Sequence, residues 1–247
     1  MSVMDSPPLR AGWDRVKWED VSNLALAGAD STTVKALSDA STGISSAPSQ
    51  VYPPDVGLFQ QGSHPQHVYF IERGLVKLSR VERDGQQIII GLRSSGWALG
   101  TSAAILQKQS PVSATTLTSC QVRHISAEAF RHLVKTDVQF SWHIQHAQSR
   151  ETHEQITRIT RLSCHSARQR LEQLLWELTS VLAFENKKKE VRIEVPLKQW
   201  EIAQLIDVTP EHLCRMLKQL EEEGILSRKK GWLIANNAPT LWHSDTP

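Results

Sequence analysis

Short apolar runs separated by turn residues fill the first half of the chain, and longer helical patterns fill the second half. The runs are rich in β-branched and aromatic residues and are broken by glycine, proline and an Asp-Gly pair. Many short strands of this kind are typical of a β-sandwich or barrel. Asp84-Gly85 predicts a hairpin, because this pair tolerates the positive φ angles of a tight primed turn. The predicted strands are centred on residues 68–71, 75–78, 88–90, 112–117 and 122–125.

A helical pattern without glycine or proline extends from residue 137 to residue 181. That span is too long for one globular helix. Ser166 and Gln169 fit a capping box, in which the serine hydroxyl accepts a backbone N–H and the glutamine side chain reaches back. The pattern therefore predicts one long helix that ends near Cys164 and a second from Ala167 to about Val181. The buried stripe expected in the second helix is Leu171, Leu174, Leu175 and Leu178.

The long helix carries too few apolar residues to bury itself well alone. Trp142, Ser149, Ile156 and Ser163 recur every seven residues, with Ile159 between them, as in the seam of a coiled coil. We therefore expect a parallel homodimer with a moderately weak contact along this helix. The alternative is a monomer in which the helix lies along one face of the β domain.

Segment 195–236 has the pattern of a helix-turn-helix followed by a two-stranded wing. Residues 207–209 form the connection, with Thr209 as the N-cap of the second helix and Pro210 as its first residue. The wing follows Gly224 and has a basic tip at residues 228–231. The apolar residues are Ile202, Ala203, Leu205 and Ile206 in the first helix, and Leu213, Met216, Leu217 and Leu220 in the second.

The polar face of the second helix suits a DNA duplex. Its first turns can enter the major groove, where Arg215 can donate two bonds to guanine and Glu211 can accept from a cytosine amino group. His212 lies beside them as a third candidate for base contacts. The alternative is that Glu211 and Arg215, four residues apart, form an ion pair on a solvated helix. Candidate phosphate contacts are Lys198, Thr209, Lys218, Lys229 and Lys230.

Composition limits the function classes. The chain has 247 residues and 40% hydrophobic residues, which suffices for two small domains, while a net charge of +2 means that any basic surface is local. No apolar run approaches the roughly 20 residues of a membrane helix. Residues 1–10 lack the basic start and apolar core of a secretory signal, so we expect a cytoplasmic protein without membrane contact. The basic run 187–189 is typical of a solvated loop.

Cysteines and histidines give no firm cofactor site. Cys120, Cys164 and Cys214 are odd in number and scattered, which disfavours disulfides and cysteine-ligated metals and favours buried thiols. Three histidines, at 143, 146 and 153, share one side of the long helix and are candidate ligands for haem or a metal, but no second cluster with ligand spacing supports such a site, and the same holds for His64 and His67, which flank a proline. We expect no cofactor. Catalytic signatures such as His-Glu-x-x-His and Gly-x-Ser-x-Gly do not occur, so we do not expect an enzyme.

The order of a β-rich domain, a long helix, a short helix and a winged helix-turn-helix resembles the Crp/Fnr superfamily of bacterial transcription regulators. The resemblance runs from about residue 51 to residue 236. Its most specific parts are residues 68–77, Asp84-Gly85, Gly96 with Gly100, and residues 211–215, which are similar to the family's Glu-x-x-x-Arg recognition helix. The resemblance implies a homodimer that reads a palindromic operator with half-sites of the TGA type, and RNA polymerase as a partner if the protein activates transcription.

Two departures bear on the effector that the resemblance implies. Members that bind cyclic AMP carry a Gly-Glu pair for the ribose and a downstream Arg-Ser or Arg-Thr for the phosphate, where this chain has residues 100–102 and 111–113 without a cation. A buried phosphate without a guanidinium is poorly compensated, so we do not expect control by classical cyclic AMP binding. The chain also lacks the N-terminal cysteines of the iron–sulfur members. The candidate effector pocket consists of Gly100, Thr101, Ser102, Val112 and Ser113.

The combined prediction is an α+β protein with an N-terminal β-roll or jelly-roll sensor domain, a long dimerisation helix and a C-terminal winged helix-turn-helix. It acts as a sequence-specific DNA-binding transcription regulator. The alternative is a protein that senses a cyclic nucleotide or another small ligand and uses its helix-turn-helix for protein interaction. The expected divisions are a loosely structured extension at 1–49, the sensor domain at 50–136, the dimerisation helix at 137–165, the winged helix-turn-helix at 166–236 and a tail at 237–247.

Overall fold

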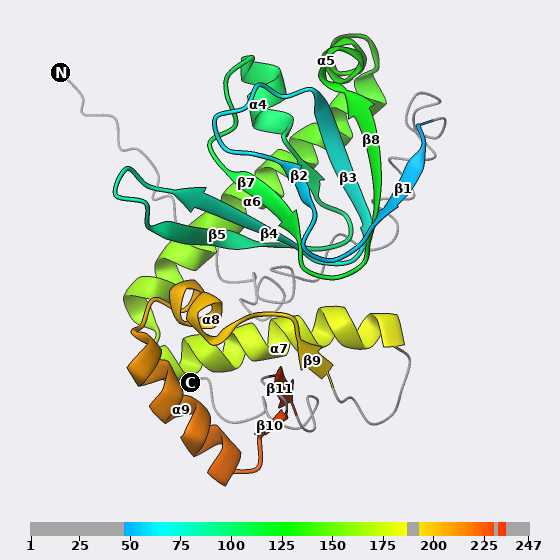
Figure 1. The fold of residues 1–247 in the computed structure, drawn as a ribbon. Helices are drawn as coiled ribbons and strands as arrows, with labels where there is room; N and C mark the ends of the chain where they lie inside the picture. Colours follow the sequence, from blue (N-terminus) through cyan, green and yellow to red (C-terminus); the bar gives the residue numbers. More distant parts are fainter. Residues whose placement is uncertain (1–46, 187–192, 230–231, 236–247) are drawn as a thin grey trace, which may run out of the picture.

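The computed structural model describes residues 47–186, 193–229 and 232–235 (Figure 1). The expected extension up to residue 46, the basic run 187–189, Lys230 and the tail from residue 236 lie outside the described residues. The β domain precedes a long helix, and a smaller helical domain with its own short sheet follows. The predicted fold class is confirmed.

The β domain consists of two four-stranded antiparallel sheets that enclose an apolar core. One sheet has the order β1-β8-β3-β6 and the other the order β2-β7-β4-β5. Residues on alternate positions of β3 and β4 point inward, which is the expected period of half-buried strands. The strands are β1 Ser49–Tyr52, β2 Gly57–Phe59, β3 His67–Arg73, β4 Val76–Val81, β5 Gln87–Arg93, β6 Ala98–Leu99, β7 Ser113–Thr116 and β8 Cys120–Ser126.

The hairpin predicted at Asp84-Gly85 connects β4 and β5, but its turn is not the tight primed turn that we expected. Gly85 has a φ of 83°, whereas Asp84 is not among the residues with positive φ. The backbone N–H of Gly85 donates to the Glu82 carbonyl at 3.0 Å, and that of Gln86 donates to the Asp84 carboxylate at 2.9 Å. The connection is longer than two residues, so only the glycine needs the left-handed conformation.

Three helices of the described chain are attached to the β domain. The helix α4 Thr101–Leu106 lies between β6 and β7, and α5 Ala127–Thr136 follows β8. The long helix α6 Val138–Cys164 starts at its N-cap Asp137, whose carboxylate accepts from the backbone N–H of Phe140 at 2.9 Å. Phe140 meets Phe130 of α5 edge-to-face, with ring centroids 5.8 Å apart. The first turns of α6 are thereby anchored to the β domain.

The break between the two long helices forms as the capping box predicts. The backbone N–H of Ser166 donates to the Gln169 side chain at 2.9 Å, and the N–H of Gln169 donates to the Ser166 hydroxyl at 3.3 Å. The helix α7 Ala167–Asn186 is longer than expected. Leu182 continues the buried stripe beyond Val181, so burial favours further helical turns. The four predicted leucines of α7 are all buried.

The C-terminal domain contains α8 Gln199–Leu205, α9 Pro210–Glu222, and a sheet of order β10-β11-β9. The strands β10 Leu226–Lys229 and β11 Trp232–Ala235 form the predicted wing. The third strand, β9 Ile193–Val195, was not predicted, because three residues are too few for a recognisable pattern. The apolar faces of α7, α8 and α9 share one core, which fixes the position of α9.

The two domains are joined by direct contacts and not only by the chain. Lys77 of β4 forms an ion pair with Glu201 of α8, and both side chains are largely buried. The Gln204 side chain donates to the Gln87 carbonyl at 2.7 Å and accepts from the backbone N–H of Ile89 at 3.2 Å. Three leucines of the β domain also belong to the core of the C-terminal domain, and they are Leu75, Leu92 and Leu117.

Two further observations correct or complete the sequence analysis. Cys120 is buried as expected, but Cys164 and Cys214 are exposed. Cys164 is the last residue of α6, and Cys214 lies on the solvent-facing side of α9.

In the described ranges, no helix combines enough length and apolarity to span a bilayer.

Candidate nucleic-acid interface

The turn between α8 and α9 is held in a defined conformation. Asp207 has a φ of 52°, the left-handed region that aspartate tolerates better than most residues. The Arg170 guanidinium of α7 donates to the carbonyl oxygens of Ile206 at 2.8 Å and Asp207 at 3.4 Å. The last carbonyl oxygens of a helix have no donor within the helix, so they need donors such as this guanidinium. The turn therefore fixes the angle at which α9 leaves α8.

The start of α9 forms as predicted from Thr209 and Pro210. The Thr209 hydroxyl accepts from the backbone N–H of His212 at 3.3 Å, and Pro210 occupies the first turn. The pKa of the Glu211 carboxyl lies below its usual range, because its own backbone N–H and the Thr209 hydroxyl donate to it and because the Arg215 charge adds a smaller effect. Glu211 is thus an ionised acceptor at the helix N-terminus.

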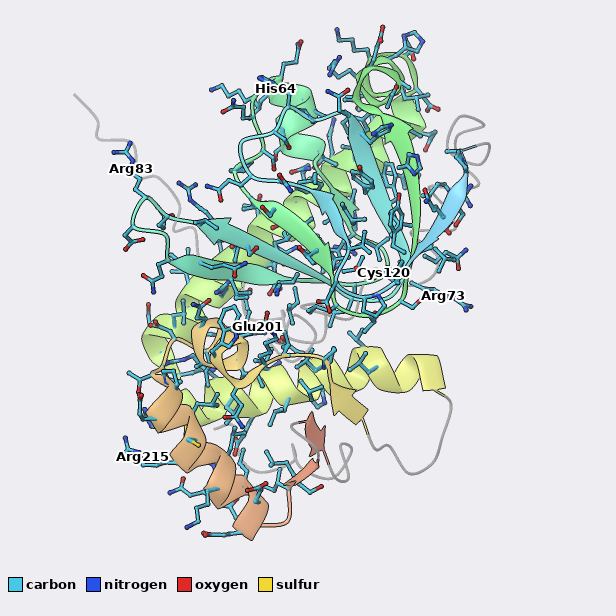
Figure 2. All side chains as sticks on the ribbon, in the orientation of Figure 1. His64, Arg73, Arg83, Cys120, Glu201 and Arg215 are labelled. Atoms are coloured by element: carbon cyan, nitrogen blue, oxygen red, sulfur yellow. The ribbon has the colours of Figure 1, made fainter. Side chains whose placement is uncertain are left out.

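The two faces of α9 differ sharply. The inner face contains the predicted residues Leu213, Met216, Leu217 and Leu220, and all four are buried. The outer face is exposed to solvent, and Figure 2 shows Arg215 projecting from α9 on the side turned away from α7. The exposed residues of this face are Glu211, His212, Cys214, Arg215, Lys218 and Gln219. A capped helix with an exposed polar face matches the shape of the DNA major groove.

The side chains of Glu211 and Arg215 on α9 interact electrostatically but do not form a direct ion pair. Among the described residues, no salt bridge links Glu211 to Arg215. Lys218 does approach Glu222, at 3.8 Å, but both side chains are strongly exposed, and such surface pairs contribute little to stability. No salt bridge therefore holds the Glu211 carboxylate and the Arg215 guanidinium to each other.

The candidate phosphate contacts come from different elements of the C-terminal domain. Lys198 is exposed and directly precedes α8, where its backbone N–H donates to the Glu201 carboxylate at 2.8 Å. Thr209 and Lys218 belong to α9 or its cap. Lys229 is the last residue of β10, and Lys230 lies outside the described residues. Cations around a groove-binding helix are the usual partners of backbone phosphates.

The structure does not bring the five residues of the candidate effector pocket together in one cavity, and they engage different partners. Gly100 has a φ of 81° and precedes α4. The Thr101 hydroxyl is buried and accepts from the Gln148 side chain of α6, whereas Ser102 is exposed. The Ser113 hydroxyl accepts from the backbone N–H of Gln61 at 2.9 Å. A cavity of about 280 Å³ between the loop 60–66 and α4 is lined by Gly100 but by none of the other four.

A second group of residues in this region was missed by sequence reasoning. The guanidinium carbons of Arg93 and Arg150 lie 4.6 Å and 4.3 Å from the ring centroid of Trp97. Arg93 also pairs with Glu151 of α6, and Arg150 donates to the Gly96 carbonyl at 2.6 Å. These contacts fasten α6 to the β domain. They join residues that are far apart in the sequence, so no local sequence pattern predicts them.

The seam predicted on α6 is exposed along its length. Trp142, Ile156 and Ile159 keep 64%, 58% and 64% of their surface accessible, and the two seam serines are not buried either. Exposed polar residues separate Trp142 from Ile156 and Ile159, so the apolar surface of this helix lies in two places. The histidines of this helix do not gather into a metal site, since no group of metal-ligating side chains is found in the described part of the chain.

Comparisons with known proteins agree with this architecture. A family model for the cyclic nucleotide-binding domain matches residues 49–137, and a model for the Crp-like helix-turn-helix domain matches residues 169–242. The cAMP-activated global transcriptional regulator CRP of Haemophilus influenzae is 22% identical over 182 residues, which are 71% of this chain and 78% of that protein. The CRP-like protein Clp of Xanthomonas campestris is also 22% identical, over 181 residues with the same coverage.

Solved structures show the same fold. The c-di-GMP responsive global regulator CLP of Xanthomonas campestris superposes with a TM-score of 0.63 at 19% identity, over 84% of this chain and all of that one. FixK2 of Bradyrhizobium japonicum gives a TM-score of 0.64 at 19% identity, over 78% of this chain and 93% of that one. Both share the arrangement of a β domain, a long helix and a helix-turn-helix domain.

Proposed function

Because this chain belongs to the Crp/Fnr family of DNA-binding transcription regulators, we propose that it acts as a homodimer on an inverted-repeat operator. Each copy inserts α9 into the major groove of one half-site. Glu211, His212 and Arg215 contact base edges, while Lys198, Thr209, Lys218, Lys229 and Lys230 contact phosphates. The protein works in the cytoplasm, and RNA polymerase is its partner if it activates transcription.

The observation that carries this proposal is the division of α9 into a fully buried and a polar, exposed face. Leu213, Leu217 and Leu220 fix the helix on α7 and α8, so the outer side chains are presented without ordering a flexible segment. The ionised Glu211 accepts hydrogen bonds, and Arg215 donates them. One acceptor and one two-pronged donor one turn apart can read two neighbouring base pairs.

The homodimer rests on the seam of α6. Trp142, Ile156 and Ile159 would remain in water in an isolated chain, and burying them against the same residues of a second copy removes that apolar surface. A two-fold symmetric contact between identical helices is the common way to form a dimer. It also places two copies of α9 in one particle, which an inverted-repeat operator requires.

The effector is not cyclic AMP bound as in the named CRP relatives. Residues 111–113 carry no cation for the phosphate, and the Thr101 hydroxyl is already engaged with Gln148 of α6. Arg150, which donates to the Gly96 carbonyl, stacks on Trp97. Signalling would instead proceed through a shift in the packing of α6, with the C-terminal domain moving about residues 164–166.

Selection of bound duplexes from a random pool tests the proposal. The purified chain, with and without cyclic AMP, should recover one inverted repeat whose half-sites are about one helical turn apart, and cyclic AMP should not alter it. Recovery of a sequence only with cyclic AMP would contradict the effector part alone. Failure to enrich any sequence in either condition would contradict DNA recognition.

A further inference from the structure

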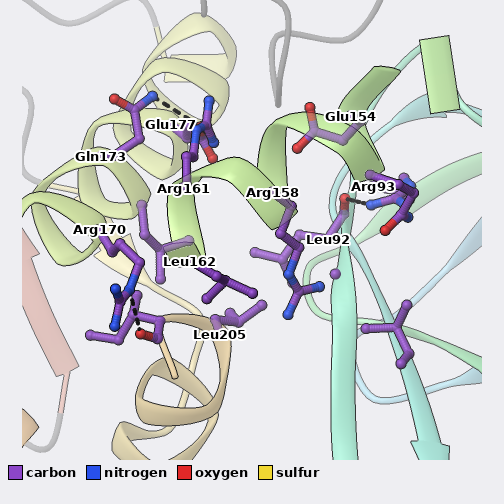
Figure 3. Close-up of a pocket in the computed structure, with 15 residues that line it drawn as sticks. Leu92, Arg93, Glu154, Arg158, Arg161, Leu162, Arg170, Gln173, Glu177 and Leu205 are labelled. Atoms are coloured by element: carbon purple, nitrogen blue, oxygen red, sulfur yellow. Dashed lines mark hydrogen bonds and ion pairs between the residues drawn. The ribbon is translucent and has the colours of Figure 1, made fainter. Parts of the chain in front are cut away.

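A charged cavity of about 90 Å³ lies where the β domain, the long helix and the helix-turn-helix domain meet (Figure 3). Its walls come from β5, α6, α7 and α8, and none of the five residues of the candidate effector pocket lines it. One water molecule needs about 10–15 Å³ of such space, so the cavity holds several waters or one small ion. The ionisable residues of its lining are Arg93, Arg158, Arg161, Arg170, Glu154 and Glu177.

Positive charge exceeds negative charge around this cavity. Arg161 forms an ion pair with Glu177 at 2.7 Å, and Arg93 is paired with Glu151. The other two guanidinium groups bind only neutral oxygens among the bonds identified in the described residues. Arg158 donates to the Ile89 carbonyl at 3.2 Å, and Arg170 donates to backbone carbonyls at the ends of α6 and α8. Carbonyl groups satisfy N–H donors but do not neutralise a charge, so the Arg158 charge is offset only through space, by Glu154 and Asp207, against burial and the Arg93 charge.

Hydrogen-bonding capacity is also left over on the same wall. The Nη2 atom of Arg161 is buried and has no hydrogen-bond partner within the described parts of the chain. Arg158 uses one of its N–H groups in the bond to Ile89, although a guanidinium offers five. The two arginines are three residues apart on α6, so their side chains leave the same face of the helix. A buried donor without a partner destabilises a protein unless a ligand or water meets it.

We propose that this cavity binds a small divalent oxyanion of the sulfate or phosphate type through Arg158 and Arg161. A tetrahedral oxyanion presents several acceptor oxygens to the planar donor edges of guanidinium groups. It would compensate the charge of Arg158 and satisfy the free nitrogen of Arg161 in one step. The cavity is small enough to favour a free ion over a nucleotide.

Binding of the anion is coupled to protonation of Glu154. This carboxyl faces Arg93 from β5 and Glu177 from α7, and on its own helix it lies near Glu151, Arg158 and Arg161. Burial, and then the Glu177 charge, raise the pKa of Glu154 to about 7. An anion beside the carboxylate favours its neutral form further, so anion affinity should decrease as the pH rises through neutrality.

Sulfate is the suitable probe, because it stays divalent across this pH range. Calorimetric titration of the full chain with sodium sulfate, compared with sodium chloride at equal ionic strength, should show one site per chain that is tighter at about pH 6 than at about pH 8. Arg158→Gln should weaken sulfate binding at least about tenfold, because one charged donor is removed. The matched control is Arg83→Gln on the exposed hairpin, which should bind sulfate like the unaltered chain.

The variant Glu154→Gln tests whether protonation of Glu154 causes the pH dependence of sulfate binding. This variant should bind sulfate with the same affinity at both pH values, and circular dichroism should show that both arginine variants are folded. If the unaltered chain binds sulfate no better than chloride, or if Arg158→Gln binds it unchanged, the proposed site is wrong. If Arg158→Gln does not fold, sulfate titrations of Arg158→Lys and Glu154→Gln test the proposed site in its place. These titrations contain no DNA, so their outcome is independent of the proposed operator binding.

Discussion

The helices α6 and α9 each have one buried face and one exposed face, but only the exposed face of α6 includes large apolar side chains. The exposed face of α9 carries charged and amide side chains, among them Glu211, Arg215 and Lys218. The exposed face of α6 carries Trp142, Ile156 and Ile159. Water solvates the charged side chains well and these three apolar side chains poorly. The difference supports the proposed roles of the two helices, in which α9 meets DNA and the apolar positions of α6 meet a second copy of the chain.

The largest effect on stability is expected from a change on the inner face of α9. This face holds the helix in place and so positions the residues of its outer face. Leu217→Ala removes a side chain that is fully buried and should lower the free energy of unfolding by about 2–5 kcal/mol. Gln219→Ala, two residues further along on the exposed face, should change it by less than about 0.5 kcal/mol. Urea unfolding of the full chain measures both. Equal decreases would contradict the assignment of the two faces.

The exposed face of α6 can be tested by placing a charge in its seam. Ile159→Asp should raise the dissociation constant of the dimer at least about 100-fold, because each copy then buries a carboxylate in place of an apolar side chain. Ile88→Asp, a matched change of an exposed isoleucine on β5, should leave the dimer intact. Sedimentation equilibrium distinguishes the two. A dimer unaffected by Ile159→Asp would place the interface elsewhere.

The inner face of α6 should give stability a dependence on pH. The pKa of Glu154 is raised from 4.5 to about 7 by burial and by Glu177, so the folded state holds a proton that the unfolded state releases. The resulting stabilisation is complete below about pH 4.5 and is lost as the pH rises through about 7. Glu154→Gln should remove this contribution, which is on the order of 2 kcal/mol.

Urea unfolding at about pH 5 and about pH 8 checks this expectation. The difference between the two pH values should be smaller in Glu154→Gln than in the unaltered chain, because glutamine does not titrate. An unchanged difference would mean that other groups carry the pH dependence.

The smallest effect is expected from a phosphate-binding lysine on the outer face of α9. Lys218→Ala should weaken binding to all duplexes by a similar factor of a few. It should also reduce the slope of log affinity against log salt by about 0.9, the value for one phosphate that the protein no longer neutralises. Fluorescence anisotropy at several salt concentrations gives both values. A change that depends on sequence would instead assign Lys218 to the recognition of a base.

Features that depend on neighbouring residues could be predicted from the sequence. The cap of α9 at Thr209, the left-handed Asp207 and the box of Ser166 with Gln169 each involve residues within one turn. The leucine stripe of α7 follows from the helical period alone. Since these local rules determine most helix boundaries, the architecture and the outer face of α9 could be predicted from the sequence alone.

Features that depend on distant contacts could not be predicted. Lys77 and Glu201 are separated by 124 residues, and Arg93 and Glu151 by 58, so no spacing rule connects them. The strand β9 is recognisable only by its pairing with β11. Exposure of Cys164 follows from the three-dimensional position of its helix face. The charged cavity falls in the same class, because four elements must meet to form it.

The most direct test of α9 as the reading helix is a measurement of base discrimination by Arg215. Fluorescence anisotropy would compare a selected operator with the same duplex altered at one guanine per half-site, at one stated salt concentration. The unaltered chain should discriminate by a factor of about ten or more, since a two-pronged guanine contact is worth about 1–3 kcal/mol. Arg215→Ala should bind both duplexes equally while remaining folded. If Arg215→Ala discriminates as well as the unaltered chain at every guanine tested, α9 does not read the operator through this residue and the account is wrong.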